Sequence, residues 1–510
     1  MERRKFIKIG GGLAAFLLAV SKQAYGFVPA HNWEKYDFGP EPKVWNRLNQ
    51  GPFPIYAPEA IVPDSNVVMA TTPSKKILRN YGMGLVVYIS GDIGAPKIQG
   101  QSLEKSIDDL IKIPFVQKIY MRPNWREIQK RPDRLDFPDY WKITLDLAKQ
   151  YNKNVGFRVM LENPDVPYIG VPEFLVGKVP YVKLKGEWKG DPSMVRYRKV
   201  QKMPRYDNPV YQEAFDELNA LLADKFNGNP MIEYMDTFMY GFWGEGHTWP
   251  FIGNPFPDNF TAEETFKKMF DTQLKYWTKT PLVTNTQPDY SRVGNSDIVD
   301  KTIRSHNWIR TDTIFIENMQ IESLSNRPAW VAAVSEIGIK RLVDMKTTQE
   351  VNMNANIISH VMDLGVNYWS VWNWHHIAAE NILDYYKKYP EPINEISHRI
   401  GYRVRPSWIW SCDRGLIFGM VNDGIAAVPG VLRLTVFNED HSLEISGEMD
   451  AGYPKPQGVR QAMVDLPKGV DWKGLRFKVE LKVKGQLYPV EMSCEQKTNP
   501  DGSLTLAPNV

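Results

Sequence analysis

Cysteine and net charge are both scarce in this sequence. Its 510 residues include two cysteines, Cys412 and Cys494, which excludes a disulfide-rich scaffold and leaves no CxxC pair for a metal. Both lie in the last quarter of the chain, so one bridge between them is compatible with the sequence but not required. The formal net charge of +3 is too small to indicate a nucleic-acid partner or a membrane surface. The 43% hydrophobic and 24% charged residues are ordinary for a globular protein, here long enough for more than one domain.

The first 26 residues lack the apolar length of a membrane span and have the order of an export signal. A basic start precedes an apolar run at residues 10–20, and small residues at 24–26 offer a cleavage site before Phe27. The pair Arg3-Arg4 resembles a twin-arginine signal, and an ordinary secretory signal is the alternative. No cysteine follows the apolar run, so a lipoprotein anchor is not expected. We therefore expect a periplasmic or secreted bacterial protein with no membrane insertion after signal removal.

The remaining chain divides into three parts by pattern. Residues 27–80 are rich in proline, asparagine and aromatics and predict an extended lead-in. Residues 81–400 repeat a strand, a loop and a helix, and residues 401–510 change to the two-residue period of antiparallel strands. This last part predicts a small β-sandwich that either binds substrate or braces the larger domain, and we favour bracing.

The middle part predicts a (β/α)8 TIM barrel, because eight buried strands alternate with helices. The expected strands are residues 84–90, 116–121, 154–161, 231–239, 281–286, 313–316, 330–335 and 366–372. The expected helices between them include 139–151, 209–228, one ending near 279 with a capping box at Thr261, and 347–362. An open doubly wound sheet is the alternative. The first strand lacks a glycine-rich phosphate loop, which argues against a nucleotide-binding version.

Chemistry in such barrels lies where the strands end, at the C-terminal face. The residues expected there are Arg122 after strand 2; Arg158, Glu162 and Asn163 after strand 3; Trp243, Glu245 and His247 after strand 4; Asn285 after strand 5; Glu317 after strand 6; Glu336 after strand 7; and Trp369, Trp372, Trp374 and His375 after strand 8. Sixteen tryptophans and twenty-four tyrosines add flat faces that can stack on sugar rings, although aromatics also fill cores.

Two of these residues, Glu245 and Glu336, suit glycoside hydrolysis, which needs two carboxyl groups on opposite sides of the scissile bond. The arrangement resembles clan A of the retaining (β/α)8 glycoside hydrolases. The resemblance implies that Glu245 is the acid/base, that Glu336 is the nucleophile steadied by Arg122, and that Trp372 or Trp369 floors the sugar site. It departs from the clan at Gly244, where the clan usually has Asn, so another residue such as Asn285 or Asn163 must meet the sugar 2-hydroxyl.

The residues themselves support different protonation states for the two glutamates. Apolar Trp243 beside Glu245 should favour its acid form, and Arg122 should keep Glu336 ionised. Glu162 and Glu317 are rival carboxylates. Trp369 and Trp372 are three apart and point to opposite faces of a regular strand, so at most one can reach the pocket. The histidines lack the HExxH spacing, so no metal or other cofactor is expected.

A basic, aromatic segment separates strand 3 from the helix that begins at Pro209. Residues 178–205 contain nine Lys or Arg residues against two acids, with Tyr181, Trp188 and Tyr197 interleaved. A loop of this length inside a compact domain is usually functional. We hypothesise that it lines a cleft for an anionic glycan, and a solvated loop with a charge bias is the alternative.

The sequence therefore predicts an exported glycoside hydrolase acting on a carbohydrate, with no nucleic-acid partner. Two other classes stay open. A carbohydrate-binding protein on a hydrolase-like barrel would keep the tryptophans without needing the glutamates. A polysaccharide lyase would use Tyr or His with Arg and would leave an unsaturated sugar.

Overall fold

The computed structural model describes residues 66–89, 100–166, 168–186, 200–249, 251–286, 295–313, 324–339, 347–373 and 379–507. The expected export signal lies outside these residues.

Eight parallel strands form a closed barrel, as the sequence predicts, and not an open sheet. In chain order they are β2 (Gly84–Tyr88), β3 (Lys118–Met121), β4 (Asn154–Phe157), β7 (Ile232–Asp236), β9 (Leu282–Asn285), β10 (Trp308–Thr313), β11 (Ala333–Ile339) and β12 (Tyr368–Asn373). Each strand pairs with the next, and β12 closes the ring against β2. The fourth strand, β7, and the seventh, β11, are separated by β9 and β10.

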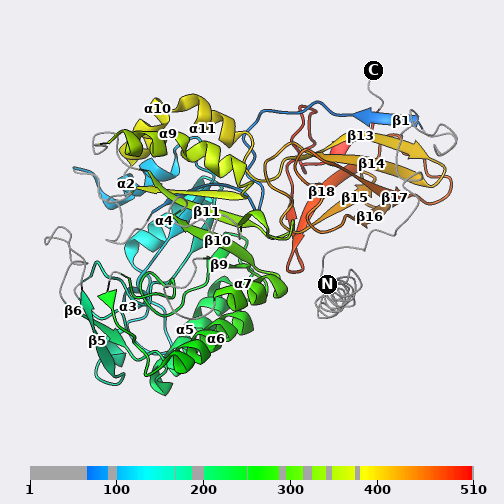
Figure 1. Ribbon diagram of the computed structural model, residues 1–510. Helices are drawn as coiled ribbons and strands as arrows, with labels where there is room; N and C mark the ends of the chain where they lie inside the picture. The colour runs from blue at the N-terminus through cyan, green and yellow to red at the C-terminus, as the bar shows by residue number, and fades with distance from the viewer. Residues whose placement is uncertain are drawn as a thin grey trace, which may run out of the picture.

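Helices surround this barrel (Figure 1). They are α2 (Leu103–Ile111), α3 (Trp125–Ile128), α4 (Asp139–Gln150), the 3-10 helix η4 (Glu173–Leu175), α5 (Pro209–Phe226), α6 (Asn259–Tyr276), α7 (Asn295–Arg304), α9 (Thr348–Asp363), α10 (Ala379–Lys388) and α11 (Pro390–Ser397). Strand side chains alternate between two environments. In β3, Ile119 and Met121 pack in the core under the helices, whereas Tyr120 packs inside the barrel.

The predicted boundaries are wrong in two informative places. The sixth strand, β10, begins at Trp308, before the expected start at residue 313, because Arg310 faces the barrel interior and makes this part of the strand look polar in the sequence. Helix α6 begins earlier than its expected capping box at Thr261. Its N-cap is Asp258, whose side chain accepts from the Thr261 N–H at 2.7 Å.

The C-terminal part is an antiparallel two-sheet domain beside the barrel (Figure 1). One sheet has the order β1-β13-β14-β17, formed by Asn66–Ala70, Val404–Cys412, Gly415–Asn422 and Val459–Asp465. The other has the order β16-β15-β18-β19, formed by Glu444–Glu448, Val431–Phe437, Arg476–Val483 and Gln486–Pro489, with β20 (Leu504–Thr505) on β18. Strand β1 belongs to the expected lead-in, so part of that segment is a strand of this domain.

This domain packs against the N-terminal end of the barrel. Tyr81, just before β2, stacks on Tyr488 with ring centroids 3.6 Å apart. The Tyr402 hydroxyl donates to the Tyr81 carbonyl at 2.8 Å, and Lys484 Nζ donates to the Trp277 carbonyl at 2.9 Å. The loops that follow the barrel strands lie at the opposite end of the barrel, where the parallel strands finish.

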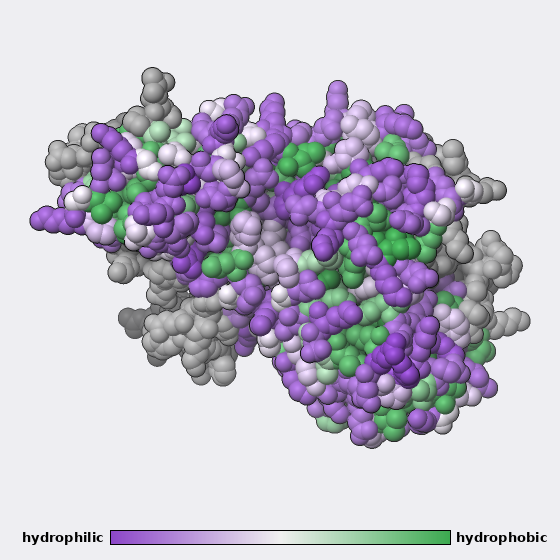
Figure 2. All heavy atoms as spheres, turned by 180° about the vertical axis from the view of Figure 1, so that it is seen from behind, coloured by the Kyte–Doolittle hydropathy of each residue, from purple (hydrophilic) through white to green (hydrophobic). Residues whose placement is uncertain are grey.

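Two of those loops form a small sheet of order β6-β5-β8, made by Val200–Pro204, Tyr181–Gly186 and Phe251–Ile252. Strands β5 and β6 lie on the side of the barrel away from the C-terminal domain (Figure 1). Seen from behind, hydrophilic side chains cover most of the surface, and apolar groups form scattered patches (Figure 2). Among the described residues, no helix is long and apolar enough to cross a bilayer.

Candidate active site

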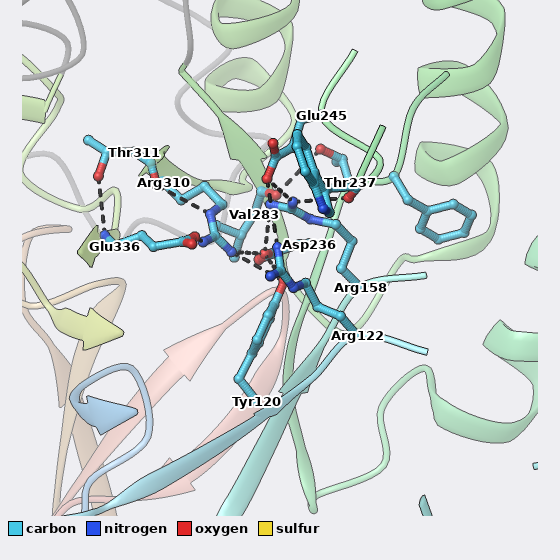
Figure 3. Close-up of polar contacts among 12 residues, drawn as sticks. Tyr120, Arg122, Arg158, Asp236, Thr237, Glu245, Val283, Arg310, Thr311 and Glu336 are labelled. Carbon is cyan, nitrogen blue, oxygen red and sulfur yellow. Dashed lines mark hydrogen bonds and ion pairs between the residues drawn. The ribbon is translucent and has the colours of Figure 1, made fainter. Parts of the chain in front are cut away.

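Charged side chains from five barrel strands converge at the C-terminal end of the barrel (Figure 3). They point inward from the strands or from the residue that follows each: Arg122 after β3, Arg158 after β4, Asp236 in β7, Arg310 in β10 and Glu336 in β11. All five are at most 6% exposed. Charges this deeply buried require partners, and these residues are paired with one another or with Glu245.

The ion pairs join Glu245 to Glu336 through three intermediates. Arg158 Nη1 donates to Glu245 Oε1 at 2.6 Å, and its Nη2 donates to Asp236 Oδ2 at 3.2 Å. Arg310 continues the series, because its Nη1 donates to Asp236 Oδ2 and its Nη2 pairs with Glu336 Oε2. The order is therefore Glu245, Arg158, Asp236, Arg310, Glu336, with alternating charge.

Arg122 lies on the Glu245 side of this network, which corrects its expected role. Its Nη1 is 3.9 Å from Glu245 Oε1, and its guanidinium lies 5.0 Å from the centre of the Tyr88 ring. The cation that pairs with Glu336 is Arg310 instead. The sixth strand was predicted to begin at residue 313, after Arg310, so Arg310 was not expected to point into the barrel.

The loop that carries Glu245 is folded by backbone hydrogen bonds between its own ends. The Phe242 N–H donates to the His247 carbonyl at 2.9 Å, and the Met239 N–H donates to the Gly244 carbonyl at 2.9 Å. Gly241 has a φ of +84°, and a Cβ there would lie 2.1 Å from the His247 oxygen. Only glycine permits this close approach of the two backbone segments.

The same packing favours glycine at position 244. Its φ is +79°, and a Cβ would lie 3.2 Å from Arg158 Cδ and 3.2 Å from Phe238 Cβ. A side chain at this position would push against the arginine that holds Glu245. The absence of a side chain at position 244 therefore leaves room for Arg158.

His247 completes the surroundings of Glu245. Its Nε2 is 3.1 Å from Glu245 Oε2, so the two carboxylate oxygens meet Arg158 and His247 separately. The imidazole is 3% exposed, and its ring centroid lies 5.6 Å from that of Trp243. Trp243 is itself buried, and its ring is 6.2 Å from that of Trp249, which is 40% exposed.

These contacts reverse the expected protonation of Glu245. Burial alone raises the pKa of its carboxyl, as the position of Trp243 suggests, but this is outweighed by the hydrogen bond with His247 and by the charges of Arg158 and Arg122. The net result is a pKa below the ordinary value for Glu. Glu245 is therefore a carboxylate at neutral pH, and the predicted acid form is wrong for this state of the protein.

Other predicted residues lie nearby but make different contacts. Glu162 is fully buried, and its Oε1 accepts from the Gly170 N–H at 2.9 Å, so it holds a loop. Asn163 Nδ2 donates to Asn124 Oδ1 at 3.3 Å. Asn285 ends β9 and is paired with Arg310 in the neighbouring strand, which places it at the correct end of the barrel.

Two of the predicted tryptophans, Trp369 and Trp372, lie in the eighth strand, β12. Trp369 is 1% exposed and packs in the core under the helices, so the expectation that it contacts substrate is wrong. Trp372 is paired with Gly338 of β11. Glu317, Trp374 and His375 lie outside the described residues.

Two residues of the network carry no motif and were missed in the sequence. Asp236 accepts from the Tyr120 hydroxyl as well as from both arginines. The alternation of side chains along a strand could have found both residues. Asp236 is two positions after the inward-facing Tyr234, and Arg310 is two positions after the inward-facing Trp308, so each lies on the inward face. A polar residue on the inward face of a barrel strand therefore indicates where the packed interior of the barrel ends.

The described residues contain no group of three or more His, Cys, Asp or Glu side chains arranged to hold a metal ion. Within the network, three arginines face three carboxylates, so its formal charge is balanced. This arrangement can orient two glutamates and supply cations to groups that become negative.

No protein-family model matches this chain, and no curated protein matches it. The catalytic domain of a β-amylase from Paenibacillus polymyxa is 10% identical, with a TM-score of 0.40 over 62% of this chain and 98% of that one. A GH5_18 protein from Streptomyces cattleya, in complex with GlcNAc, is 10% identical, with a TM-score of 0.35 over 53% and 64%. A D-allulose 3-epimerase from Methylomonas sp. is 11% identical, with a TM-score of 0.31 over 63% and 99%. The barrel fold of this chain follows from its own strand pairing.

Proposed function

We propose that this protein is a glycoside hydrolase whose reaction takes place at the C-terminal end of the barrel, between Glu245 and Glu336. One observation carries the proposal: a buried glutamate after the fourth barrel strand and another in the seventh are joined by a single charged network. Hydrolysis of a glycosidic bond uses two such carboxyl groups. A retaining mechanism, with Glu336 as nucleophile, is part of the proposal.

The contacts of each glutamate support different roles. Glu336 is paired with the fixed Arg310, and the Thr311 hydroxyl oxygen accepts from its backbone N–H at 3.2 Å, so its position is well defined for attack. Glu245 has a lowered pKa, so it is a poor proton donor by itself. We assign donation to the Glu245–His247 pair, because His247 Nε2 lies 3.1 Å from Glu245 Oε2 and the two groups can share a proton.

The direct test is turnover of the purified full chain on a panel of neutral and carboxylated oligosaccharides, with the anomer of the product followed by NMR. We expect Glu336→Gln and Glu245→Gln each to lower kcat by at least about 100-fold, because each removes a group that acts in the transition state. Retention of the anomeric configuration supports the double displacement, and inversion would replace it with a water-activating role for one glutamate.

Glu162→Gln is the matched control for these substitutions. This carboxylate is equally buried at the same end of the barrel, and its contact with Gly170 needs only an acceptor oxygen, which Gln retains. The control should keep turnover within a few-fold. Equal losses in all three variants would mean that the glutamates serve stability and not chemistry.

The pH profile separates the two possible proton donors. If Glu245 alone donates, its lowered pKa confines activity to acid pH, because the carboxyl loses its proton below the ordinary range of Glu. If the pair with His247 donates, activity does not depend on protonation of Glu245 alone and extends above the acid range. We expect the second profile, and His247→Gln should confine the remaining activity to acid pH, where Glu245 itself carries the proton.

A carbohydrate-binding protein is the second candidate function, and one observation favours it. Every carboxylate of the network already contacts an arginine, an arrangement that a non-catalytic barrel would also tolerate. Such a protein would show no turnover and would keep its tryptophan fluorescence response to sugar after either Glu→Gln change. A product that absorbs in the ultraviolet would instead indicate a lyase.

We also propose that residues 1–26 direct export. The basic start, the short apolar run and the small residues before Phe27 support this. The mature protein collected outside the cytoplasm should begin near Phe27, and Arg3→Lys with Arg4→Lys should retain it inside if the route is the twin-arginine one. Export of the double variant would indicate an ordinary secretory route.

A further inference from the structure

The sheet formed by β6, β5 and β8 presents one face to solvent, and that face is basic. Alternation along β5 leaves Tyr181, Lys183 and Lys185 exposed while Leu184 is buried. In β6, Lys202 is exposed beside the buried Gln201 and Met203. The exposed side chains therefore gather on one side of the sheet, and the described part of this face contains no acidic residue.

Two of these lysines lie directly opposite each other. Lys183 is the cross-strand partner of Lys202 in the antiparallel pair, where like charges destabilise the sheet. In the part of the chain that the structure describes, neither has an ion pair, and Lys202 Nζ instead lies 4.7 Å from the centre of the Tyr181 ring. An anion bound at this face would offset the repulsion between the two ammonium groups, which gives a reason for two lysines at these paired positions.

The same sheet is tied to the loop that carries Glu245. Strand β8 follows that loop, and β5 pairs with β8 through Lys185–Ile252 and Gly186–Phe251. Phe251 in turn packs on Phe242, with ring centroids 5.5 Å apart. Ile252 is 53% exposed and Trp249 is 40% exposed, so uncovered apolar groups lie along the chain between the basic face and the buried Trp243.

We propose that this face, defined by Tyr181, Lys183, Lys185, Lys202 and Ile252, binds the carboxylate groups of an acidic polysaccharide whose chain continues past Trp249 to the glutamates. The inference rests on the proposed function for the part of the ligand that reaches Glu245. Charge complementarity gives the class of ligand, since ammonium groups pair with carboxylates and aromatic faces stack on sugar rings.

The spacing of the lysines favours a uronate polymer over a more densely charged one. Cross-strand neighbours are about 5 Å apart at Cβ, and next-nearest residues on one strand are about 7 Å apart. These separations are comparable with the length of one sugar unit. One ammonium per sugar unit matches a polymer with one carboxylate per unit.

Binding to polygalacturonate, dextran sulfate and uncharged dextran tests the proposal. It is measured by affinity electrophoresis on the full chain carrying Glu336→Gln, so that turnover cannot consume a probe and absence of activity does not affect the result. We expect binding to polygalacturonate that weakens about tenfold in Lys183→Gln/Lys202→Gln, since each exposed ion pair contributes up to about fivefold. Lys468→Gln/Lys473→Gln, in exposed turns of the C-terminal domain, makes the same change in charge and should have no effect.

The single substitution Lys183→Glu separates binding from stability. It replaces a repulsive cross-strand pair by an attractive one, so the midpoint of thermal unfolding should rise while binding to polygalacturonate falls. A fall in both would mean that Lys183 has a structural role. Equal binding to dextran sulfate with the same dependence on the lysines, or no binding to polygalacturonate, would overturn the proposal.

Discussion

The Asp236 carboxylate accepts hydrogen bonds from three side chains, those of Tyr120, Arg158 and Arg310. It contacts neither glutamate, yet each arginine that it holds contacts one of them. Asp236 is therefore a positioning residue: it fixes two guanidinium groups so that Glu245 and Glu336 face the same opening. The aspartate is fully buried, so its loss would leave both cations without their shared anion.

We predict that Asp236→Asn lowers the free energy of unfolding by roughly 3 kcal/mol or more, because it breaks a buried charge network. It should also lower kcat more than it raises KM, since the glutamates lose their relative placement. Urea denaturation and steady-state kinetics measure the two effects. Tyr120→Phe, which removes one hydrogen bond to the same carboxylate, should cost only about 1 kcal/mol. Equal effects of the two changes would contradict a central role for the charge.

Glu245 makes the stability of the folded protein depend on pH, and the lowered pKa of its carboxyl gives the direction of that dependence. Because its pKa is lower in the folded protein than in the unfolded chain, it contributes stability that is complete above the ordinary pKa of Glu. This contribution decreases as pH falls from about 4.5 through the lowered folded pKa.

The free energy of unfolding of the wild type should therefore fall more steeply between pH 5 and pH 3 than that of Glu245→Gln. Denaturant titrations at several pH values measure both slopes. Parallel curves would show that the contacts with Arg158 and His247 do not stabilise the ionised carboxyl.

At the scale of one element, the loop from 237 to 249 depends on residues with positive φ. Trp243, at +53°, and Gly244, at +79°, are consecutive left-handed residues, and Gly244 also lies against Arg158. We predict that Gly244→Asn, the residue usual in clan A, destabilises the protein by about 1–3 kcal/mol and lowers kcat because it displaces Arg158.

Gly177→Asn is the matched control, since Gly177 has a φ of +81° with open space around its Cβ position. The difference in unfolding free energy between the two variants reports the contact with Arg158 separately from backbone strain. If the two variants lose the same stability and keep the same kcat, the packing around Gly244 has no role in the site.

The barrel strands were predictable as elements because their outward residues pack under helices and give apolar runs. The runs at 84–90 and 281–286 contain β2 and β9 almost entirely. The prediction fails where inward residues are charged, as in β10 around Arg310, and at the cap of α6, where Asp258 precedes the expected Thr261. Local pattern does not reveal such residues because their partners, such as Asp236, are distant in sequence.

The position of Glu245 and Glu336 at one end of the barrel was predictable, but the residues that pair with them were not. Strand order alone placed Glu245 and Glu336 at one end of the barrel. Which arginine meets which glutamate depends on the inward phase of each strand, and the lowered pKa of Glu245 follows from those contacts. The sequence motif around Trp243 suggested burial, which is correct and is the largest single influence on this pKa, but the contacts with His247, Arg158 and Arg122 together outweigh it.

At the scale of the whole molecule, Lys484 links the C-terminal domain to the barrel. It lies in the turn between β18 and β19, and its Nζ donates to the Trp277 carbonyl and to Asn307 Oδ1, both at 2.9 Å. Burial lowers the pKa of its ammonium group to about 7. The folded protein therefore binds this proton less tightly than the unfolded chain, so stability rises with pH from about 7 towards the ordinary pKa of Lys.

We predict that Lys484→Met removes this rise. The difference in unfolding free energy between wild type and variant should shift in favour of the wild type as pH increases from 7 to 9, measured by urea denaturation. Other buried groups, such as Lys153 with its own lowered pKa, are present in both proteins and cancel. A difference independent of pH would mean that Lys484 stays charged at the interface.

Strand β1 has a consequence for how the chain is completed during synthesis. Among the described strands it is paired only with β13, and the Thr71 hydroxyl just after it donates to the Pro406 carbonyl, 335 positions later. While the ribosome makes the barrel, this apolar strand has emerged and its partner does not yet exist. The last sheet can close only near the end of translation, and until then residues 66–70 form an open edge that a neighbouring nascent chain could occupy.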